Sequence, residues 1–351
     1  MININLVSRK RHGGGSMSAY MKMLKSRITE ANMIKLIQPL SSVPKIRRLA
    51  EYIYFPFYVK KNIKKPGVVH ICEQYLAFIL NFVNIKNTVV TYHGGLSLKR
   101  LKNYNLRDRL TTDFFIKGLR KADHIIAVSH TAKNDLITFL KCDPLKIEVI
   151  YYGVDPVYKV LDNVEKNKNK KCILHVGCDD KENRKNIVGI LKSLANLKKR
   201  FPDFEFIQVG DHNRNFDDLI QKLGLKNEVK FLGFISDSEK LARLYNKADL
   251  FVFPSFYEGF GWPPLEAMAC GCPTITSNNS SLPEVVGNAA ILINPHNLGE
   301  LEEAMYGVLT SEKNQKVLSK KGLERAAKFN WEESAQKTKD SYKRVLEKRG
   351  S

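Results

Sequence analysis

Two glutamates, Glu258 and Glu266, flank a run of glycine, proline and aromatic residues in SFYEGFGWPPLEAMACGCP (255–273). Pro263 and Pro264 suit the first turn of a helix, which we expect to continue to Gly271. The N-terminus of such a helix offers free amides and a partial positive charge to an anion. The helix is preceded by Gly259, Phe260 and Gly261, and the two glycines allow close approach of a ligand to the backbone.

The two carboxylates need a role other than phosphate binding, because like charges repel. We expect them to accept hydrogen bonds from sugar hydroxyls, since a pair of glutamates suits vicinal diols. A capping glutamate and a surface helix glutamate would explain either residue alone. That interpretation does not explain the Gly-Phe-Gly-Trp-Pro-Pro run between them.

Short runs rich in β-branched residues alternate with longer segments of helical period. Continuous apolar strands separated by helices are what a parallel sheet buried on both faces requires. The pattern therefore predicts an α/β protein with two doubly wound parallel sheets. The expected strands are INLV (4–7), VVHIC (68–72), TVVTY (88–92), HIIAV (124–128), IEVIYY (147–152), CILHVG (172–177), FEFIQVG (204–210), VKFLG (229–233), LFVFP (250–254), PTITS (273–277) and AAILI (289–293).

The polar segment KVLDNVEKNKNKK (159–171) has the composition of a linker. A chain of 351 residues also exceeds the size at which one hydrophobic core usually keeps growing. We therefore predict one domain over residues 1–160, a second over 161–335, and a helical C-terminal segment over 336–351. In open parallel sheets, ligands bind beyond the carboxyl ends of the strands, where SFYEGFGWPP lies.

The net charge of +21 is concentrated near the N-terminus, where residues 1–70 contain 14 Lys and Arg against two Asp and Glu. Such a field attracts nucleic acid, an anionic bilayer or phosphorylated substrates alike. No nucleic-acid-binding motif is recognisable, so no nucleic acid partner is expected. The segment 43–65 interleaves basic residues with aromatic ones, which suits the headgroup region of a membrane. It also suits a core-packing segment with a solvated basic face, and both interpretations stay open.

The longest apolar stretch, VVHICEQYLAFILNFVNI, is interrupted by Glu73 and Gln74 and is not expected to span a membrane. The basic cluster at the N-terminus follows the apolar residues, the reverse of a secretory signal, so we expect a cytoplasmic protein. Six cysteines occur without a CxxC pair or finger-like histidine spacing, which argues against disulfides and a zinc site. No Asp-x-Asp flanked by apolar strand residues occurs, so no metal is expected.

From residue 248 to 295, ADLFVFPSFYEGFGWPPLEAMACGCPTITSNNSSLPEVVGNAAILINP closely resembles the signature of a known family. The family is the group 1 glycosyl transferases, retaining enzymes of GT-B fold that use nucleotide sugars and carry a Glu-x7-Glu motif. The resemblance implies two Rossmann-like domains facing a central cleft, the first binding the acceptor and the second the donor, with the last helix returning to the first domain. Weaker similarities keep the family's order: ADHIIAVSHTAKNDL (122–136), VIYYGVDP (149–156), VGCDDKENRKN (176–186), VKFLGFIS (229–236) and FNWEESA (329–335).

The resemblance assigns roles to four charged residues. The second glutamate of the motif, here Glu266, holds the ribose hydroxyls of the donor, and the first, Glu258, contacts the transferred hexose. Arg184 and Lys185 would hold the diphosphate, whose charge grows as the glycosidic bond breaks. Many relatives have an arginine directly after the donor-binding glycine corresponding to Gly177. This chain has a cysteine there, so the basic pair must carry more of the diphosphate binding.

Further donor contacts are expected on both domains. Gly14 and Gly15 would let the first loop approach the diphosphate, although their GGG run lacks the third glycine of a dinucleotide fingerprint. His93 in TYHGG resembles the family's histidine near the transferred sugar. Phe234 and Ile235 follow the VKFLG strand and are candidates to sandwich the nucleobase.

Together, these resemblances imply retaining transfer of a hexosyl group from a nucleoside diphosphate sugar to a saccharide or lipid-linked saccharide in glycan or lipopolysaccharide assembly. The YEGFG and SSLPEV segments favour mannose from GDP-mannose; a UDP-sugar-dependent glucosyl or N-acetylhexosaminyl enzyme is the alternative. No cofactor or metal is expected besides the co-substrate, and an anionic surface at the inner face of a membrane is a further candidate partner. A non-catalytic sugar-nucleotide-binding protein and a sugar-nucleotide epimerase are the rival classes.

Overall fold

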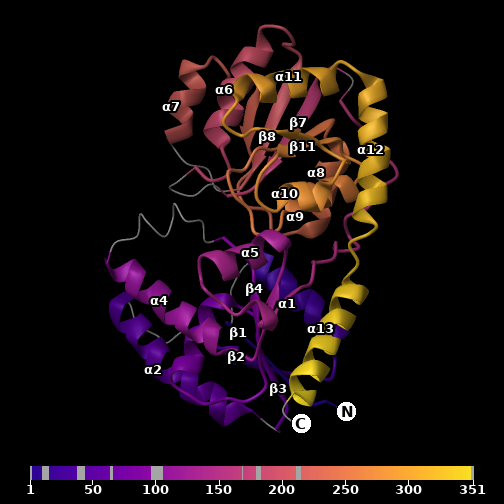
Figure 1. The fold of residues 1–351 in the computed structure, drawn as a ribbon. Coiled ribbons are helices and arrows are strands. Elements are labelled where there is room, and N and C mark those ends of the chain that lie inside the picture. Colours follow the sequence, from indigo (N-terminus) through magenta and orange to yellow (C-terminus); the bar gives the residue numbers. More distant parts are fainter. Residues whose placement is uncertain are drawn as a thin grey trace. The chain divides into compact units, whose positions relative to one another are not determined.

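Two compact units make up the chain, as Figure 1 shows. In the computed structural model of the protein, the first unit consists of Met1–Gly153 and Trp331–Ser351, and the second of Val154–Asn330. The boundaries predicted at residues 160 and 335 lie a few residues beyond these divisions. The residues that the structure describes are 2–9, 16–37, 44–63, 66–95, 106–167, 169–178, 183–210 and 215–348.

The first unit is built on a six-stranded sheet in the order β2-β1-β3-β4-β5-β6. All of its neighbouring strands pair in parallel, and Val7 in β1 lies opposite Ile34 of β2 and Ile71 of β3. The strand order reverses between β1 and β3, which is where an open parallel sheet commonly binds a ligand. The strands are β1 (Ile4–Arg9), β2 (Asn32–Leu36), β3 (Val68–Ile71), β4 (Thr88–Tyr92), β5 (His124–Ala127) and β6 (Ile147–Val149).

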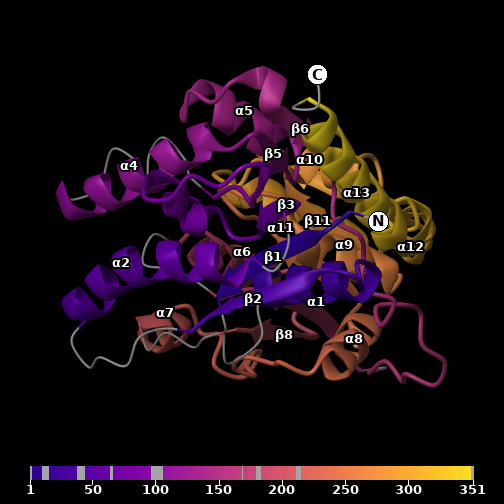
Figure 2. The ribbon, with the colours of Figure 1, turned by 90° about the horizontal axis from the view of Figure 1, so that it is seen from below.

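Helices cover both faces of this sheet, with α1 and α13 on one side and α2 and α4 on the other (Figures 1 and 2). The last helix, α13, packs against the sheet and against α1. Its Tyr342 hydroxyl lies 2.6 Å from Nδ1 of His70 in β3, and both side chains are buried. The helices are α1 (Ser16–Arg27), α2 (Pro44–Asn62), η1 (Gln74–Asn81), α4 (Leu106–Lys121), α5 (His130–Thr138), η2 (Pro144–Lys146) and α13 (Trp331–Glu347).

The basic and aromatic segment of the sequence forms α2, and its two faces differ. Phe55 and Val59 are fully buried against the rest of the unit. The opposite side carries apolar and basic side chains that are exposed to solvent. We call it the outer face of α2, formed by Ile53, Tyr54, Phe57, Lys60 and Lys61. The core-packing interpretation therefore describes one side of this helix and leaves the other without a protein partner within the described residues.

The second unit contains a six-stranded sheet in the order β12-β11-β10-β7-β8-β9, again parallel throughout. Its strands are β7 (Lys171–Val176), β8 (Phe204–Val209), β9 (Val229–Phe231), β10 (Leu250–Phe253), β11 (Thr274–Ser277) and β12 (Ile291–Ile293). Its helices are α6 (Ile187–Lys198), α7 (Asn215–Lys222), α8 (Ser238–Lys247), α9 (Trp262–Ala269), α10 (Leu282–Val286), α11 (Leu298–Leu309) and α12 (Glu312–Ala326).

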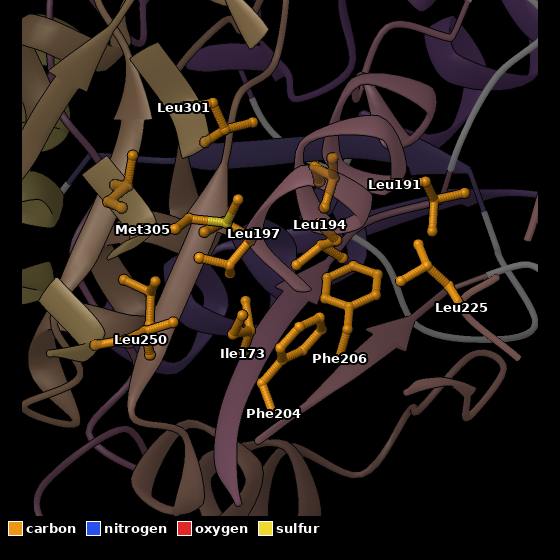
Figure 3. Close-up of a cluster of buried hydrophobic side chains, with 14 of the residues drawn as sticks. Ile173, Leu191, Leu194, Leu197, Phe204, Phe206, Leu225, Leu250, Leu301 and Met305 are labelled. Atoms are coloured by element: carbon orange, nitrogen blue, oxygen red, sulfur yellow. The ribbon is translucent and has the colours of Figure 1, made fainter. Parts of the chain in front are cut away.

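Alternating strand residues feed two separate cores on the two faces of this sheet. Phe204 and Phe206 of β8 pack with α6 and α11 in the cluster drawn in Figure 3. Ile207 and Val209 point to the other face, where they pack with α8 and α9. Both faces are therefore dry, which holds the carboxyl ends of the strands at fixed positions.

The predicted fold class, two doubly wound parallel sheets, is confirmed. Each of the eleven expected strands is present, but β2 (Asn32–Leu36) was not predicted. Its sequence NMIKL carries polar residues, because β2 is an edge strand that is buried on fewer sides.

Two expectations from composition can also be compared with the structure. Within the described residues, no helix is both long enough and apolar enough to cross a bilayer. All six cysteines are free, and five of them are buried, whereas Cys178 is exposed directly after Gly177.

Candidate active site

Glu258 lies in the loop between β10 and α9. This loop is hydrogen-bonded to a second loop, which follows β11. The amide of Glu258 donates to Oγ of Ser280 at 3.0 Å. Oγ of Ser281 donates to the carbonyl oxygen of Phe260 at 2.6 Å, and the Asn279 side chain donates to the carbonyl of Phe256 at 3.2 Å. The SNNSS segment after β11 therefore fixes the backbone that carries the first glutamate of the motif.

Three donors converge on one oxygen of the Glu258 carboxylate. Oε1 accepts hydrogen bonds from Oγ of Ser255 at 2.6 Å, Nζ of Lys185 at 2.7 Å and Nη1 of Arg184 at 2.9 Å. Within the described part of the chain, no hydrogen bond reaches Oε2. Glu258 therefore has one oxygen committed to protein donors and the other available to a hydroxyl group.

The cluster combines two cations with one carboxylate and is largely buried. Glu258 is 9% exposed and Lys185 is 8% exposed. Burial pushes the pKa of Glu258 upward, but the charges of Lys185 and Arg184 outweigh burial and hold its pKa below the ordinary value. The carboxylate is therefore ionised at neutral pH, and the two cations remain close together at one end of the sheet.

Lys185 and Arg184 are positioned by the turn that leads from β7 into α6. Asn186 caps α6 in a left-handed conformation, with φ of 58°, and accepts a hydrogen bond from the amide of Gly189 at 3.2 Å. The ammonium group of Lys185 lies 4.5 Å from the centre of the Phe253 ring, a cation–π contact. A Cβ atom on Gly177 would lie 3.2 Å from Cε of Lys185, so the glycine leaves room for this side chain.

The second glutamate of the motif, Glu266, sits in a very different environment. The predicted helix is α9, which begins after Gly261, a residue with φ of 116° that favours glycine. Oε2 of Glu266 accepts a hydrogen bond from the hydroxyl of the fully buried Tyr245 at 3.0 Å. Burial raises the pKa of Glu266 to about 7, with the charge of Asp155 adding to the shift and the Tyr245 hydroxyl opposing it.

In the first unit, both ring nitrogens of His93 are hydrogen-bonded. Nε2 lies 2.7 Å from the carbonyl oxygen of Cys72, which can only accept, so Nε2 carries the proton and Nδ1 accepts from the hydroxyl of Tyr152. The Gln74 side chain accepts from the His93 amide at 2.6 Å and donates to the Gly94 carbonyl at 3.0 Å. His93 is thus an imidazole held in a fixed orientation, on a loop that Gln74 holds.

The remaining predicted residues fall into three groups. Gly14 and Gly15 lie outside the described residues. Phe234 is 53% exposed after β9, while Ile235 packs partly against the core next to α8. Gly259 is buried, and Phe260 is buried with its ring against Phe329. The side chain of Phe260 therefore supports the loop from the interior of the protein. A ligand would approach the backbone of this loop.

Several residues of the site were missed by sequence reasoning. Ser255, Ser280 and Ser281 brace or bond Glu258, and Tyr245 bonds Glu266. The hydroxyl-rich SNNSS run directly after a predicted strand was a usable signal, because strand ends form the ligand-binding edge. Tyr245 gave no such signal, since an aromatic residue within a helix looks like ordinary core.

The protein has two parallel six-stranded sheets with helices on both faces, and the second sheet ends at a site rich in acidic, basic and glycine residues. Together these features define the GT-B class of glycosyltransferase fold. The chain belongs to the glycosyl transferases group 1 family, whose profile matches residues 159–325, while the profile of Glycosyltransferase Family 4 matches residues 28–158. The family suggested by the sequence signature is confirmed.

Characterised relatives and solved structures agree with this family. O-antigen chain mannosyltransferase B of Escherichia coli is 36% identical over 273 residues, covering 74% of this chain and 71% of the relative. Serotype-specific mannosyltransferase WbdA of Escherichia coli is 32% identical over 278 residues, but the chain spans 34% of its length.

The whole chain also has counterparts among solved structures. Sucrose-phosphate synthase from Thermosynechococcus elongatus superposes with a TM-score of 0.83 at 22% identity, covering 99% of both chains. Anabaena HepE in complex with UDP and glucose gives a TM-score of 0.79 at 18% identity, covering 97% of this chain and 99% of HepE. At these identities the likeness establishes the GT-B fold.

Proposed function

We propose that the protein transfers a hexosyl group, mannose by preference, from a nucleoside diphosphate sugar to a saccharide or lipid-linked saccharide acceptor. The observation that carries this proposal is the convergence of Arg184, Lys185 and Glu258 at the end of the second sheet, next to the N-terminus of α9. Two cations held at the end of a parallel sheet suit a diphosphate leaving group. A carboxylate with one available oxygen suits the hydroxyls of the sugar attached to it.

The residues would divide the donor between them. Glu266 accepts hydrogen bonds from the ribose hydroxyls in its ionised form, and Glu258 accepts from the hexose through Oε2. Arg184 and Lys185 bond the diphosphate, so they must share their charge between Glu258 and the incoming anion. The product diphosphate carries more negative charge than the donor. Its attraction to the two cations therefore grows as the glycosidic bond breaks.

The transfer is proposed to retain the anomeric configuration. The acceptor hydroxyl attacks from the face that the diphosphate leaves, and a diphosphate oxygen takes the hydroxyl proton. The bond from the anomeric carbon to the diphosphate breaks as the bond to the acceptor oxygen forms. Nuclear magnetic resonance of the product would give its anomeric configuration, and an inverted product would overturn this assignment.

GDP-mannose is the favoured donor, because the relatives with the higher sequence identities are mannosyltransferases. A UDP-sugar is the alternative, because Anabaena HepE was solved with UDP and glucose. Thermal-shift measurements with GDP, UDP and ADP separate these donors, since a bound nucleotide stabilises the folded protein by mass action. Release of nucleoside diphosphate only when an acceptor is present would exclude a non-catalytic binding protein and an epimerase.

The reaction is proposed to be independent of a metal ion. Arg184 and Lys185 supply the positive charge that a divalent cation supplies in other glycosyltransferases. We expect the rate of transfer to be unchanged after treatment with EDTA. Complete loss of activity that only manganese restores would contradict the diphosphate roles of both residues.

An anionic membrane surface at the cytoplasmic side is proposed as the place where the acceptor is met. The outer face of α2 carries exposed Ile53 and Phe57, at 59% and 61%, beside the basic pair Lys60 and Lys61. Exposed aromatic rings continue this surface, since Phe114 of α4 stacks with Phe82 after η1 at a centroid distance of 5.9 Å. Apolar side chains flanked by lysines suit an interface between acyl chains and anionic headgroups.

Cosedimentation with liposomes containing phosphatidylglycerol tests this surface. Replacing Lys60 and Lys61 by Gln, or Ile53 and Phe57 by Ser, should each weaken binding severalfold. The matched control replaces Lys320 and Lys321 of α12 by Gln. Equal binding of all variants at low salt would remove the outer face of α2 from the proposal.

A further inference from the structure

A cavity of about 410 Å³ opens in the first unit between α1, β2 and the carboxyl end of β1. Its volume lies within the range of about 300–1,000 Å³ typical of small-molecule sites. Figure 2 shows α1 and β2 side by side with β1. We call it the α1–β2 cavity. Its lining includes Arg9, Met17, Met21, Lys22, Met33 and Lys35.

The spacing of these residues shows that two regular elements aim their side chains into one space. Met17, Met21 and Lys25 repeat every four residues on α1, and Lys22 lies next to them on the same side. Met33 and Lys35 alternate on β2, so they point to the same face of the strand. The result is a cavity with three half-buried methionines in its lining and lysines around them.

Not every cation of the cavity is available to a ligand. Nζ of Lys25 donates to the carbonyl oxygens of Thr29 and Ala31 at 2.6 and 2.7 Å, so it holds the end of α1. Arg9 pairs with Glu51 of α2, with Nη2 3.1 Å from Oε2. The side chains of Lys25 and Arg9 are therefore engaged in contacts that stabilise the fold.

Lys22 and Lys35 are different, because both are exposed and neither forms a hydrogen bond or ion pair with any of the described residues. Within the same part of the chain, Nε of Arg9 is buried and lacks a hydrogen-bond partner. A buried donor without an acceptor is costly. Two uncommitted ammonium groups therefore belong to the lining of the cavity, together with an arginine whose buried Nε lacks an acceptor.

One acidic residue also lines the cavity. Glu73 is buried, and its Oε1 accepts from the amide of Arg9 at 2.8 Å, which ties the ends of β1 and β3 together. Its single negative charge does not offset the four basic residues of the lining, which include Arg9, Lys22, Lys25 and Lys35. The cavity is therefore electropositive and partly apolar at once.

We infer that the α1–β2 cavity binds an amphiphilic anion, namely a phosphate or diphosphate ester attached to an apolar body. Lys22 comes from α1 and Lys35 from β2, so the two cations approach from different elements, which suits a group with several acceptor oxygens. The methionines adapt their shape to an apolar chain beside it. Resting on the proposed function, the inference further assigns this anion to the acceptor substrate.

The position of the cavity agrees with an acceptor role. Glu73 in the lining is followed by Gln74, whose side chain holds the amide of His93 and the carbonyl of Gly94. The cavity and His93 therefore lie along the same carboxyl edge of the first sheet. An acceptor anchored in the cavity by its anionic end would extend along this edge.

Isothermal titration calorimetry with n-octyl phosphate tests the inference on the intact protein. Lys22→Gln combined with Lys35→Gln should weaken binding at least tenfold, whereas n-octyl glucoside, which has the chain without the charge, should bind weakly to both proteins. Lys320→Gln with Lys321→Gln on α12 is the matched control for charge loss. Unchanged thermal unfolding of the double variant is expected, because neither lysine has a partner within the described residues.

Two further arms separate the sources of binding. Met21→Ser should weaken n-octyl phosphate without changing the affinity for inorganic phosphate. Inorganic phosphate bound as tightly as n-octyl phosphate would overturn the amphiphile assignment, and equal binding of n-octyl phosphate to the double variant would overturn the site itself. Lys185→Ala should leave n-octyl phosphate binding unchanged while weakening the binding of nucleoside diphosphate, so failure of the proposed transfer reaction is read independently.

Discussion

Glu258 and Glu266 belong to one motif and one unit, yet the protein gives them opposite surroundings. Glu258 is bonded to two cations and a serine hydroxyl, and its pKa is held below the ordinary value. Glu266 is bonded to a tyrosine hydroxyl, and burial raises its pKa to about 7. The spacing of a motif thus fixes where two carboxyl groups lie, while residues far away in the sequence fix whether they are charged.

The difference suggests different duties. An ionised carboxylate surrounded by donors is part of a rigid charge cluster, which needs no reorganisation when a diphosphate arrives. A carboxyl group with a pKa near 7 gains its charge only when a ligand or a higher pH favours it. Five experiments would break or sharpen this contrast.

Loss of a cation from the Glu258 cluster should have the largest effect. Lys185→Ala should lower kcat by about 10²–10³-fold, the size of effect seen when a preorganised transition-state contact is removed. It should also destabilise the fold, but by less than the about 3 kcal/mol that an unpaired buried charge costs, because Arg184 still pairs with Glu258. Transfer rates and denaturant unfolding measure the two effects, with Lys320→Ala as the surface control.

A second variant separates charge balance from catalysis. Glu258→Gln added to Lys185→Ala removes the carboxylate that has lost one of its two cations, so the unfolding free energy should recover in part while kcat stays low. Wild-type kcat in Lys185→Ala would refute the role of this cluster in the reaction.

Removal of the Glu266 charge should have a smaller effect that is confined to the donor. Glu266→Gln should raise the Kd for the nucleotide sugar by about 10–100-fold, because hydrogen bonds to a charged acceptor contribute about 1.5–3 kcal/mol. Calorimetry with GDP-mannose measures this change, and Glu324→Gln on α12 is the control. An unchanged Kd would place the ribose elsewhere.

The pH dependence of donor affinity should distinguish the two glutamates. Because the proposed role of Glu266 is to accept hydrogen bonds from the ribose in its ionised form, affinity should rise from pH 6 to pH 8 with a midpoint near 7. Glu258 stays ionised across this window, since its pKa is lowered. The intact sugar nucleotide is the probe, because its diphosphate does not titrate there.

Stability should follow the opposite course in the absence of ligand. A folded-state pKa above the unfolded value favours the protonated protein, so stability conferred by Glu266 is present at low pH and lost as the pH rises through 7. Thermal unfolding at pH 6 and pH 8 checks the sign. Glu266→Gln should flatten both profiles, and a slope that persists in this variant would have to come from another group.

The smallest effect is expected from Tyr245→Phe. This change removes the hydroxyl that bonds Oε2 of Glu266 at 3.0 Å and opposes the rise of its pKa. The midpoint of donor binding should therefore move to higher pH by about one unit, since the hydroxyl bonds the ionised carboxylate more strongly than the protonated one, by about 1 kcal/mol. A midpoint that moves to lower pH would contradict the assigned role of the hydroxyl.

The parts of the fold that could be predicted are those set by local pattern. Apolar runs predicted the buried strands, and Pro263 and Pro264 after Gly261 predicted the start of α9 within a residue. The edge strand β2 was missed, because an edge needs less continuous apolar sequence. Local pattern is thus most informative where a segment is buried on every side.

The site shows the complementary limit. The sequence identified Arg184 and Lys185 as cations that could bind an anion. Their bonds to Glu258 span 74 and 73 positions of the chain, a separation that no local pattern encodes. The same holds for His93, whose ring is oriented by Tyr152, 59 positions away. Residue types predicted the chemistry of this edge, while the tertiary fold decided which groups neutralise each other.

Five of the six thiols are buried, and burial raises the pKa of Cys72, Cys142, Cys172, Cys270 and Cys272. Cys178 alone is exposed, and it directly follows the glycine that lies against the Lys185 side chain. A thiol-reactive fluorophore or spin label would therefore attach at one defined point of the unmodified protein. The chain carries its own reporter beside the proposed diphosphate site, so ligand titrations can be followed spectroscopically without engineering a cysteine-free background.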